Sequence, residues 1–520
     1  MQNVLELGGY KRKLVLIALG LATVLALPPI YIFPLAFVGL SGLFLFLDRV
    51  ETRKQAFVTG WMFGIGFFGG GLYWLTNAFL VHPDKHGWLI PLAVPALAVS
   101  IGVFIGFVTL LSHLFWSLRP KNDVVLGRIV LFAVAWTVIE WVRGWIFTGF
   151  PWNLIGTIWG FNDEVLQTAS YVGAYGVSFL TVLAASLGAA LYYTCKAQKG
   201  FALVAVFLLP GLMWTTGYLR LKDVVVEYHD GIVLRLVQPN ISQKTKWDKN
   251  LKIKNFNTHL ELSLAINKES ALGRPTHIIW PETAVTFAAN RDPNVLRAIS
   301  SIVPKDGTIL TGTPRMTPRG EKPFQVWNSM IAVDQNAAIV ASYDKAHLVP
   351  FGEYLPLRKW NPIPKLTAGM VDFSAGEGLQ TLQIGSLPAF SPLICYEIIF
   401  PNQVIDKKNR PQWLLNLTND GWYGDSPGPY QHLISAQMRS IEEGIPLVRV
   451  ANTGITTITD AYGRMQSSIP YGIEGVIDVQ LPLALSNVPY GAQLRTAAWA
   501  VLLIVFFILG QVLVSLRVRR

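Results

Sequence analysis

The sequence is poor in charge and almost free of cysteine. Charged side chains make up only 14% of the 520 residues, whereas 52% are hydrophobic, and this balance lies outside the usual range for soluble globular proteins. One cysteine, Cys195, follows an apolar run and the other, Cys395, lies in the polar half, which argues against a disulfide framework. Scarce cysteine is typical of a soluble part that faces an oxidising compartment. A single thiol retained in that part therefore requires an explanation.

Long polar segments are also missing before about residue 220. Apolar stretches follow one another there, near the length of roughly 20 helical residues that crosses a bilayer, and one more lies near the C-terminus. The first stretch resembles a signal peptide, but the second follows at once and favours an uncleaved anchor. The sequence predicts eight membrane spans, at approximately residues 14–27, 30–47, 56–81, 88–118, 129–147, 166–193, 201–218 and 496–516.

Basic residues set the predicted orientation, because short cytoplasmic loops carry an excess of Lys and Arg. With eight spans, five basic groups fall on one side of the membrane, in segments that hold 14 basic and four acidic residues and so most of the formal charge of +11. The charge is thus a topology signal that requires no nucleic-acid partner, and both termini are predicted to be cytoplasmic. The groups are Lys11, Arg12 and Lys13; Arg49, Arg53 and Lys54; Arg119, Lys121 and Arg128; Lys196 and Lys199; and Arg517, Arg519 and Arg520.

The polar part of the chain lies between the seventh and eighth predicted spans. Short apolar runs separated by Gly, Pro and Asn predict strands at 232–237, 277–280, 308–311, 338–342, 393–396 and 413–417. Helical periodicity marks 251–265, 295–302 and 431–443. We therefore predict a transmembrane domain over 1–219, a layered α/β sandwich domain outside the membrane over 220–490, and an eighth span with a basic cytoplasmic tail over 491–520.

Cys395 is the first candidate for chemistry. It lies in Ser391-Pro-Leu-Ile-Cys-Tyr-Glu-Ile-Ile-Phe400, a pattern typical of a buried strand followed by a helix. Amides at a helix N-terminus would lower the pKa of the thiol and favour the nucleophilic thiolate. From this segment alone, a small buried core residue explains Cys395 equally well.

Two charged residues follow other predicted strands. Glu282, in Trp280-Pro-Glu-Thr-Ala284, lies where a rigid strand end would hold a general base; a carboxylate that caps the next helix is the alternative. Lys345 follows the run 338–342, where its ammonium would stabilise a thiolate and an oxyanion. A solvated surface lysine is the alternative there, and the nearby His347 is more often structural than catalytic.

Taken together, the segments WPETA, YDKAHLVPFGEYLP and CYEIIFP, in this order, resemble the Glu, Lys and Cys motifs of the nitrilase superfamily over about half the chain. The resemblance implies an α-β-β-α sandwich. It also implies that Glu282 is the general base, Lys345 the oxyanion stabiliser and Cys395 the nucleophile.

The same resemblance implies roles for five further residues. Glu353 would be a second essential carboxylate beside the lysine, and Tyr396 and Glu397 would shape the pocket behind the nucleophile. Trp247 and Asn328 match other functional positions, although a packing aromatic and a turn residue are simpler interpretations of these two. A first-turn helix charge is the corresponding alternative for Glu397.

The flanking spans narrow the resemblance to the apolipoprotein N-acyltransferase family. Seven spans before and one after a nitrilase-like domain are similar to that family, as are the segments RGW (143–145), TGFPW (148–152), VQPNIS (237–242), KWD (246–248), WNS (327–329) and TNDGWYG (418–424). The resemblance implies that Cys395 takes an acyl chain from a glycerophospholipid, expected to be phosphatidylethanolamine, as a thioester. The N-terminal amine of a diacylglyceryl-modified apolipoprotein then accepts it. A bacterial inner membrane with a periplasmic catalytic domain follows from the same resemblance.

No metal or redox cofactor is expected, since thioester exchange needs none and no His and Cys cluster has metal-ligand spacing. A monomer is expected because the two domains look self-sufficient. Both substrates carry lipid anchors that are costly to extract into water, so aromatic lid segments are predicted at 354–363 and 422–430.

A membrane-tethered amidase-type hydrolase would use the same triad and remains an alternative function. A transporter is disfavoured, because Glu140 and Arg143, the clear ionisable pair within the spans, suit a structural ion pair.

Overall fold

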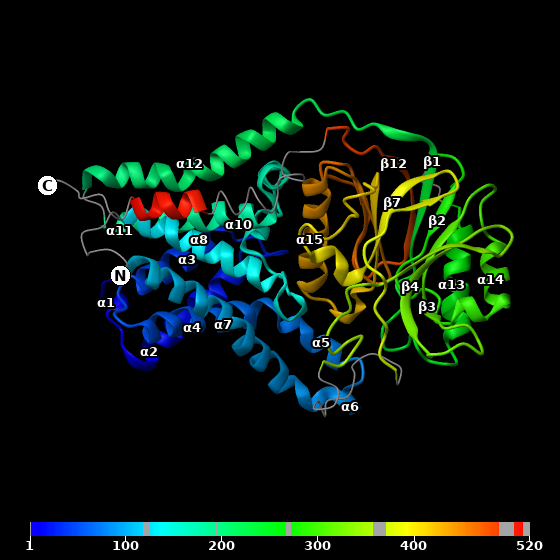
Figure 1. The fold of residues 1–520 in the computed structure, drawn as a ribbon, viewed down its shortest axis with the longest axis horizontal. Helices are drawn as coiled ribbons and strands as arrows, with labels where there is room; N and C mark the ends of the chain where they lie inside the picture. The colour runs from blue at the N-terminus through cyan, green and yellow to red at the C-terminus, as the bar shows by residue number, and fades with distance from the viewer. Residues whose placement is uncertain are drawn as a thin grey trace. The chain divides into compact units, whose positions relative to one another are not determined.

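The computed structural model describes residues 2–117, 125–193, 196–266, 272–356, 371–487 and 504–512. The chain divides into two compact units, and Figure 1 labels many of their helices and strands. The helical unit comprises Met1–Thr76, Trp88–Val224 and Val488–Arg520, and the sheet unit comprises Asn77–Gly87 and Val225–Asn487. The segment Asn77–Gly87 was not predicted to belong with the sheets. Its Asn77 Nδ2 donates a hydrogen bond of 2.6 Å to the carbonyl of Tyr423.

Close approach of helix backbones at glycine builds the helical unit. Helix α4 (Arg53–Gly71) packs against α2 (Gly9–Val24) and α7 (Ile90–Ser117). A Cβ on Gly66 would lie 2.1 Å from the Ile17 carbonyl oxygen, and small residues permit such packing in membranes. Further helices of this unit are α1 (Gln2–Leu5), α3 (Pro34–Leu47), η1 (Tyr73–Leu75), η2 (Gly87–Leu89), α8 (Val125–Arg143), η3 (Ile146–Thr148), η4 (Ile155–Trp159), α9 (Asp163–Leu166), α10 (Thr168–Leu187), α11 (Ala190–Tyr193) and α12 (Lys196–Leu221). The short helices α5 (Thr76–Phe79) and α6 (Pro83–His86) lie mostly or wholly in the segment Asn77–Gly87 of the sheet unit.

Three helical segments among the described residues are long and apolar enough to cross a membrane, Pro83–Trp116, Val125–Arg143 and Thr168–Tyr193. Arg53–Gly71 and Tyr73–Phe79 would add a fourth if this pair, bent by 51°, is one span. The apolar helix α3 is shorter, and the expected last span lies mostly outside the described residues. The predicted number of eight spans is therefore not confirmed. The predicted span 56–81 runs across the bend, because hydropathy does not register where a helix breaks.

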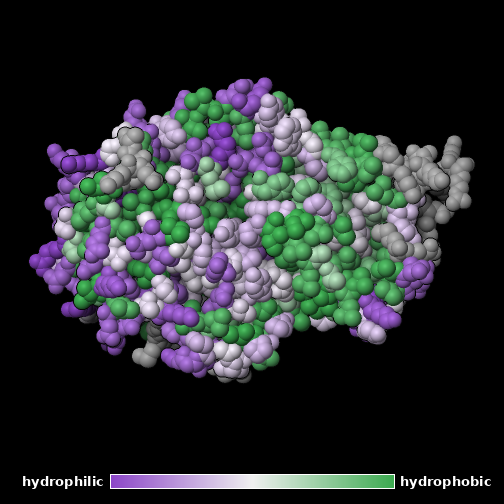
Figure 2. Space-filling model, turned by 180° about the vertical axis from the view of Figure 1, so that it is seen from behind, coloured by the Kyte–Doolittle hydropathy of each residue, from purple (hydrophilic) through white to green (hydrophobic). Residues whose placement is uncertain are grey.

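The exposed surface of the helical unit is largely hydrophobic, as the green area on the right of Figure 2 shows. Exposed apolar side chains of this unit include Leu92, Val204 and Phe207, the last of which is 66% exposed. Soluble proteins rarely leave a large continuous apolar surface in water. The helical unit is thus suited to a lipid environment.

Two six-stranded sheets form the sheet unit, with the orders β12-β1-β2-β3-β4-β5 and β11-β10-β9-β8-β7-β6. Strand β2 is parallel to β1 and β3, and β8 is parallel to β7 and β9, whereas the other neighbours are antiparallel. The strands are β1 (Tyr228–Gln238), β2 (His277–Ile279), β3 (Ile309–Met316), β4 (Val326–Val333), β5 (Ile339–Asp344), β6 (Leu382–Ile384), β7 (Leu387–Ile394), β8 (Trp413–Thr418), β9 (Leu447–Ala451), β10 (Thr456–Thr459), β11 (Met465–Ile469) and β12 (Gly475–Pro482).

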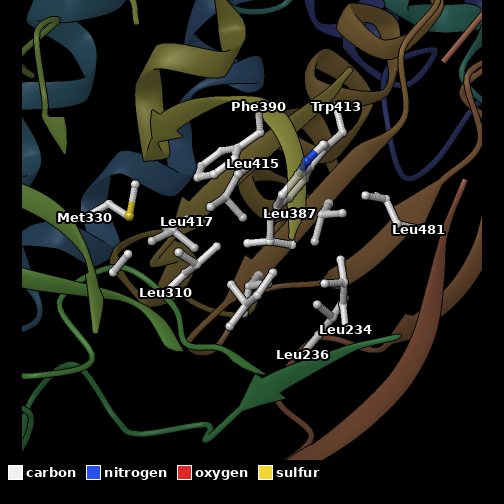
Figure 3. Packing of buried hydrophobic residues seen from close by; sticks show 14 of the residues in the cluster. Leu234, Leu236, Leu310, Met330, Leu387, Phe390, Trp413, Leu415, Leu417 and Leu481 are labelled. Carbon is white, nitrogen blue, oxygen red and sulfur yellow. The ribbon is translucent and has the colours of Figure 1, made fainter. Parts of the chain in front are cut away.

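The two sheets pack face to face around a hydrophobic core. Leu234 and Leu310 of the first sheet and Phe390, Leu415 and Leu417 of the second belong to one buried cluster, and Figure 3 shows these side chains gathered between the sheets. Helices α13 (Lys252–Leu264) and α14 (Pro293–Ser300) pack on the outer face of the first sheet. Helix α15 (Gly428–Glu443) contacts β9 of the second. This order of layers is the predicted α-β-β-α sandwich.

Candidate active site

Glu282 lies in the loop that follows the parallel strand β2, and such strand ends commonly carry the sites of α/β proteins. Its Oε1 accepts a hydrogen bond from Asn328 Nδ2 (2.8 Å), and its main-chain carbonyl accepts one from Lys246 Nζ (3.0 Å). The side chain is buried. Burial raises the pKa of Glu282, although Lys345 and Asn328 favour the charged form. The site thus holds a carboxylate with increased basicity.

Lys345 follows β5 and is 1% exposed. Its Nζ lies 2.8 Å from Glu353 Oε2, and Asn328 on β4 donates to Glu353 Oε1 (2.9 Å) as well as to Glu282. Burial acts to lower the pKa of Lys345, but the carboxylates of Glu353 and Glu282 outweigh it and raise the pKa. The lysine is therefore a fixed, charged ammonium, joined to the Glu282 carboxylate through Glu353 and Asn328.

Cys395 begins a short 3-10 helix, η6 (Cys395–Ile399), directly after β7. Its φ of +53° is a costly left-handed conformation for a residue other than glycine, of the kind that clusters at functional sites. The expected lowering of the thiol pKa is not observed. Burial, together with the Glu282 carboxylate, raises the pKa of Cys395 to about 12, although Lys345 opposes the shift. A single 3-10 turn lacks the dipole of the predicted α-helix, so the buried thiol stays protonated and requires a base.

Glu397 connects the lysine loop to the cysteine turn. Its Oε1 accepts hydrogen bonds from the Tyr343 hydroxyl (2.9 Å) and from the main-chain amides of Ala346 (2.8 Å) and His347 (3.0 Å). Its Oε2 accepts one from the amide of Ile394 (2.7 Å). These amides belong to the two residues after the lysine and the one before the nucleophile. The carboxylate therefore fixes both segments relative to each other.

The two aromatic residues predicted for the site differ in their surroundings. Tyr396 is buried beside the nucleophile, with its ring centroid 5.1 Å from that of Phe400 and 5.7 Å from that of His347. Trp247 is only half-buried, and Lys252 Nζ lies 5.7 Å from its ring centroid. Among the described residues, Trp247 makes no hydrogen bond or ring contact with another predicted site residue. The hydrogen bonds and ion pair of the site therefore do not include Trp247.

Lys246 is a site residue that the sequence did not single out. It is 2% exposed, and its Nζ donates to the Glu282 carbonyl. Burial lowers the pKa of Lys246 to about 8, although Glu282 and Cys395 act in the opposite direction. Its position in the KWD segment could have identified Lys246 from the sequence, but the prediction chose the neighbouring Trp247 instead.

The site combines a thiol, a carboxylate and an ammonium in one buried network. Such a combination can form an acyl-thioester and pass the acyl group on. Within the ranges that the structure describes, no group of three or more His, Cys, Asp or Glu side chains could hold a metal ion. The fold is that of a nitrilase-like α/β domain, and the buried thiol, carboxylate and ammonium are its candidate active site.

Two family models match the chain. Apolipoprotein N-acyltransferase N-terminal domain matches residues 19–187, and Carbon-nitrogen hydrolase matches residues 234–487. Proteins named apolipoprotein N-acyltransferase from Rhodopseudomonas palustris and Bradyrhizobium diazoefficiens are 36% and 38% identical to this chain, each over 93% of it and 91% of the relative. Among solved structures, a mutant amidase of the nitrilase superfamily from Nesterenkonia AN1 aligns with 53% of this chain and 98% of its own, at 17% identity and a TM-score of 0.35.

The sheet unit thus matches a carbon-nitrogen hydrolase domain, and the helical unit matches the N-terminal domain of apolipoprotein N-acyltransferases. The identity to the relatives extends over nearly the whole chain. The chain belongs to the apolipoprotein N-acyltransferase family.

Proposed function

We propose that the chain transfers an acyl chain from a glycerophospholipid to the N-terminal amine of diacylglyceryl-cysteine in apolipoproteins, through a thioester on Cys395. The main support for this proposal is the buried network around Cys395, Glu282 and Lys345, in a chain that belongs to the apolipoprotein N-acyltransferase family. Phosphatidylethanolamine is the donor that we expect, and a monomer is the working form.

In the first half-reaction the Glu282 carboxylate accepts the thiol proton of Cys395, and the sulfur attacks the ester carbonyl carbon of the donor. The raised pKa of the thiol requires such a base, and the raised pKa of Glu282 makes that base stronger. The Lys345 ammonium stabilises the oxyanion. The carbon–oxygen bond then breaks, the departing glycerol oxygen takes the proton from Glu282, and the lysophospholipid leaves.

In the second half-reaction the α-amine of the acceptor attacks the thioester carbon. Its proton passes to Glu282, Lys345 again stabilises the oxyanion, and the carbon–sulfur bond breaks. The proton returns from Glu282 to the Cys395 sulfur, and the product is an amide. Glu353 keeps the ammonium in place through its 2.8 Å contact, and Asn328 spaces the two carboxylates by donating to both.

The proposal places the helical unit in the inner membrane, the sheet unit in the periplasm and both termini in the cytoplasm. The apolar exposed surface of the helical unit and the basic groups of the sequence support this arrangement.

Of the two proposed lid segments, 354–363 lies mostly outside the described residues. In 422–430, Tyr430 is 36% exposed, and replacing Trp422 and Tyr430 with alanine is expected to slow turnover of lipid substrates. Unchanged turnover would count against this lid.

Mass spectrometry of the purified protein after incubation with phosphatidylethanolamine tests the proposal. We expect an acyl mass on the peptide that contains Cys395, its absence in Cys395→Ala, and its discharge by a diacylated lipopeptide amine. The match to the carbon-nitrogen hydrolase model favours a hydrolase as the second candidate. In that case the Cys395 peptide would carry no acyl group from phospholipid, and small amides would yield free acid.

A further inference from the structure

Behind the nucleophile, three titratable side chains form a cluster without solvent contact. Asp420 follows β8, His432 lies on α15 and Arg449 lies on β9, and all three are fully buried. Arg449 Nη2 lies 2.7 Å from Asp420 Oδ2 and 3.1 Å from His432 Nδ1. His432 Nδ1 lies 2.9 Å from Asp420 Oδ1. Burying such groups is costly and adds little stability by itself, and the proposed acyl transfer does not use them.

The cluster reaches the nucleophile through its main chain. His432 Nε2 lies 3.2 Å from the carbonyl oxygen of Cys395, and Asn416 Nδ2 lies 3.3 Å from the same oxygen. Arg449 Nη1 in turn donates to Asn416 Oδ1. Because a carbonyl oxygen only accepts, the contact is attractive only when Nε2 carries a hydrogen. Two donors then converge on the carbonyl of a residue whose φ is +53°.

Two of the three ring forms of His432, the neutral Nε2–H tautomer and the cation, provide that hydrogen. The neutral Nδ1–H tautomer would instead place the Nε2 lone pair against the Cys395 carbonyl oxygen at 3.2 Å. In the neutral Nε2–H tautomer, Nδ1 accepts from Arg449 Nη2, and Asp420 Oδ1 receives the Thr418 hydroxyl at 3.1 Å. In the cationic ring, Nδ1–H donates to Asp420 Oδ1 instead. Burial and Arg449 lower the pKa of His432 while Asp420 opposes them, which favours the neutral form. In each of the two forms that suit the 3.2 Å contact, an N–H points at the nucleophile's carbonyl.

We propose that His432 is a positioning residue for the nucleophile, which holds the Cys395 carbonyl together with Asn416 and so fixes the turn that presents the thiol. A residue other than glycine keeps a left-handed conformation only where its surroundings over-determine it, and the two hydrogen bonds supply that restraint. The inference rests on the proposed function, because it takes Cys395 as the nucleophile.

The test separates thiol reactivity from acyl transfer. In a Cys195→Ser background, alkylation of Cys395 by iodoacetamide is timed alongside acyl loading from phosphatidylethanolamine. His432→Leu removes the donor and is expected to slow both reactions by about 10- to 100-fold, the loss that follows a misplaced reacting group. His432→Gln keeps an N–H donor of similar reach and is expected to restore most of both rates. His259→Leu is the matched control. His259 is also buried, but it lies on α13, and its ring centroid is 5.1 Å from that of Trp280.

The inference is supported if alkylation is slow in His432→Leu, recovers in His432→Gln and keeps the parental rate in His259→Leu. This holds even if the parent takes no acyl group. Absence of acyl loading in the parent would overturn the proposed function but not the inference. Equal alkylation rates in His432→Leu and the parent would overturn the inference, as would equal losses in the two leucine variants. If His432→Leu does not fold, Asn416→Ser takes its place, and a parental alkylation rate there overturns the inference.

Discussion

Lys246 and Lys345 are both almost inaccessible to solvent, yet their pKa values shift in opposite directions. The difference lies in their partners. Lys345 has the Glu353 carboxylate at 2.8 Å, whereas the hydrogen bond described for Lys246 goes to a main-chain carbonyl. A buried charge keeps its ordinary or raised pKa only when opposite charge compensates for lost hydration. Lys345 is therefore held in its charged form by its partners, whereas burial makes Lys246 easier to deprotonate.

Replacing Lys246 with methionine is expected to change how stability depends on pH. Native Lys246 releases its proton near pH 8, whereas the unfolded chain does so near the ordinary value of 10.5. Between these values the unfolded state binds more protons, so stability rises with pH. Thermal unfolding in detergent from pH 7.5 to 9.5 should show the parent gaining Tm relative to Lys246→Met. A constant difference in Tm would contradict the assignment.

Lys345→Met is expected to destabilise the protein strongly at all these pH values. The substitution leaves the buried carboxylates of Glu353 and Glu282 without their ammonium, and breaking a buried pair in this way costs about 3–5 kcal/mol. Chemical denaturation of Lys345→Met and Lys246→Met side by side measures the contrast. Equal losses of stability in the two variants would refute this account of the site.

Glu282→Gln is expected to move two reactions of the thiol in opposite directions. Acyl loading should fall by about 10²- to 10⁴-fold, the usual contribution of a general base. The pKa of Cys395 should fall, because the Glu282 carboxylate contributes to raising it, so alkylation at pH 9 to 10 should become faster. The Tm should not fall, since burial disfavours the lost charge. Slower alkylation in this variant would argue against Glu282 lying beside the thiol.

At the scale of elements, the loop that carries Glu282 rests on β3. A Cβ on Gly312 would lie 2.3 Å from the Thr283 amide nitrogen and 2.7 Å from the Glu282 Cα, and main chain cannot yield as a flexible side chain does. Gly312→Ala should therefore displace the base loop and slow acyl loading by about 10- to 100-fold. Gly475→Ala in β12 is the control, because nothing lies within 4 Å of its added Cβ. Similar loading rates in the two variants would contradict this role for β3.

The sequence predicted strands with uninterrupted apolar runs, such as β8. It did not predict every strand in which a charged side chain is buried against a partner of opposite charge. Strand β9 was not among the predicted strands, because Arg449 interrupts its apolar pattern and is buried only through Asp420 and neighbouring groups. The predicted strand 393–396 continued past the true end of β7 at Ile394. The left-handed turn at Cys395 and the raised pKa of its thiol both depend on tertiary surroundings, which local sequence propensity does not contain.

At the scale of the whole molecule, the alternating basic groups make the proposed topology testable. Glu321 of the sheet unit and Lys54 of the helical unit are both exposed. In a Cys195→Ser background, Glu321→Cys should react with a membrane-impermeant maleimide once the outer membrane is permeabilised, whereas Lys54→Cys should react only after cell lysis. Labelling of Lys54→Cys in unlysed cells would reverse the proposed orientation.

Strands β1 and β12 are antiparallel neighbours, with Tyr228 opposite Pro482. The chain thus enters the first sheet and leaves it at adjoining points, although nearly the whole sequence of the sheet unit lies between them. Two ends that lie side by side allow a domain to be accepted within an existing loop without separating the segments on either side. In evolutionary terms, adjoining ends of this kind allow the main part of a nitrilase-type domain to be inserted as a unit between two membrane helices.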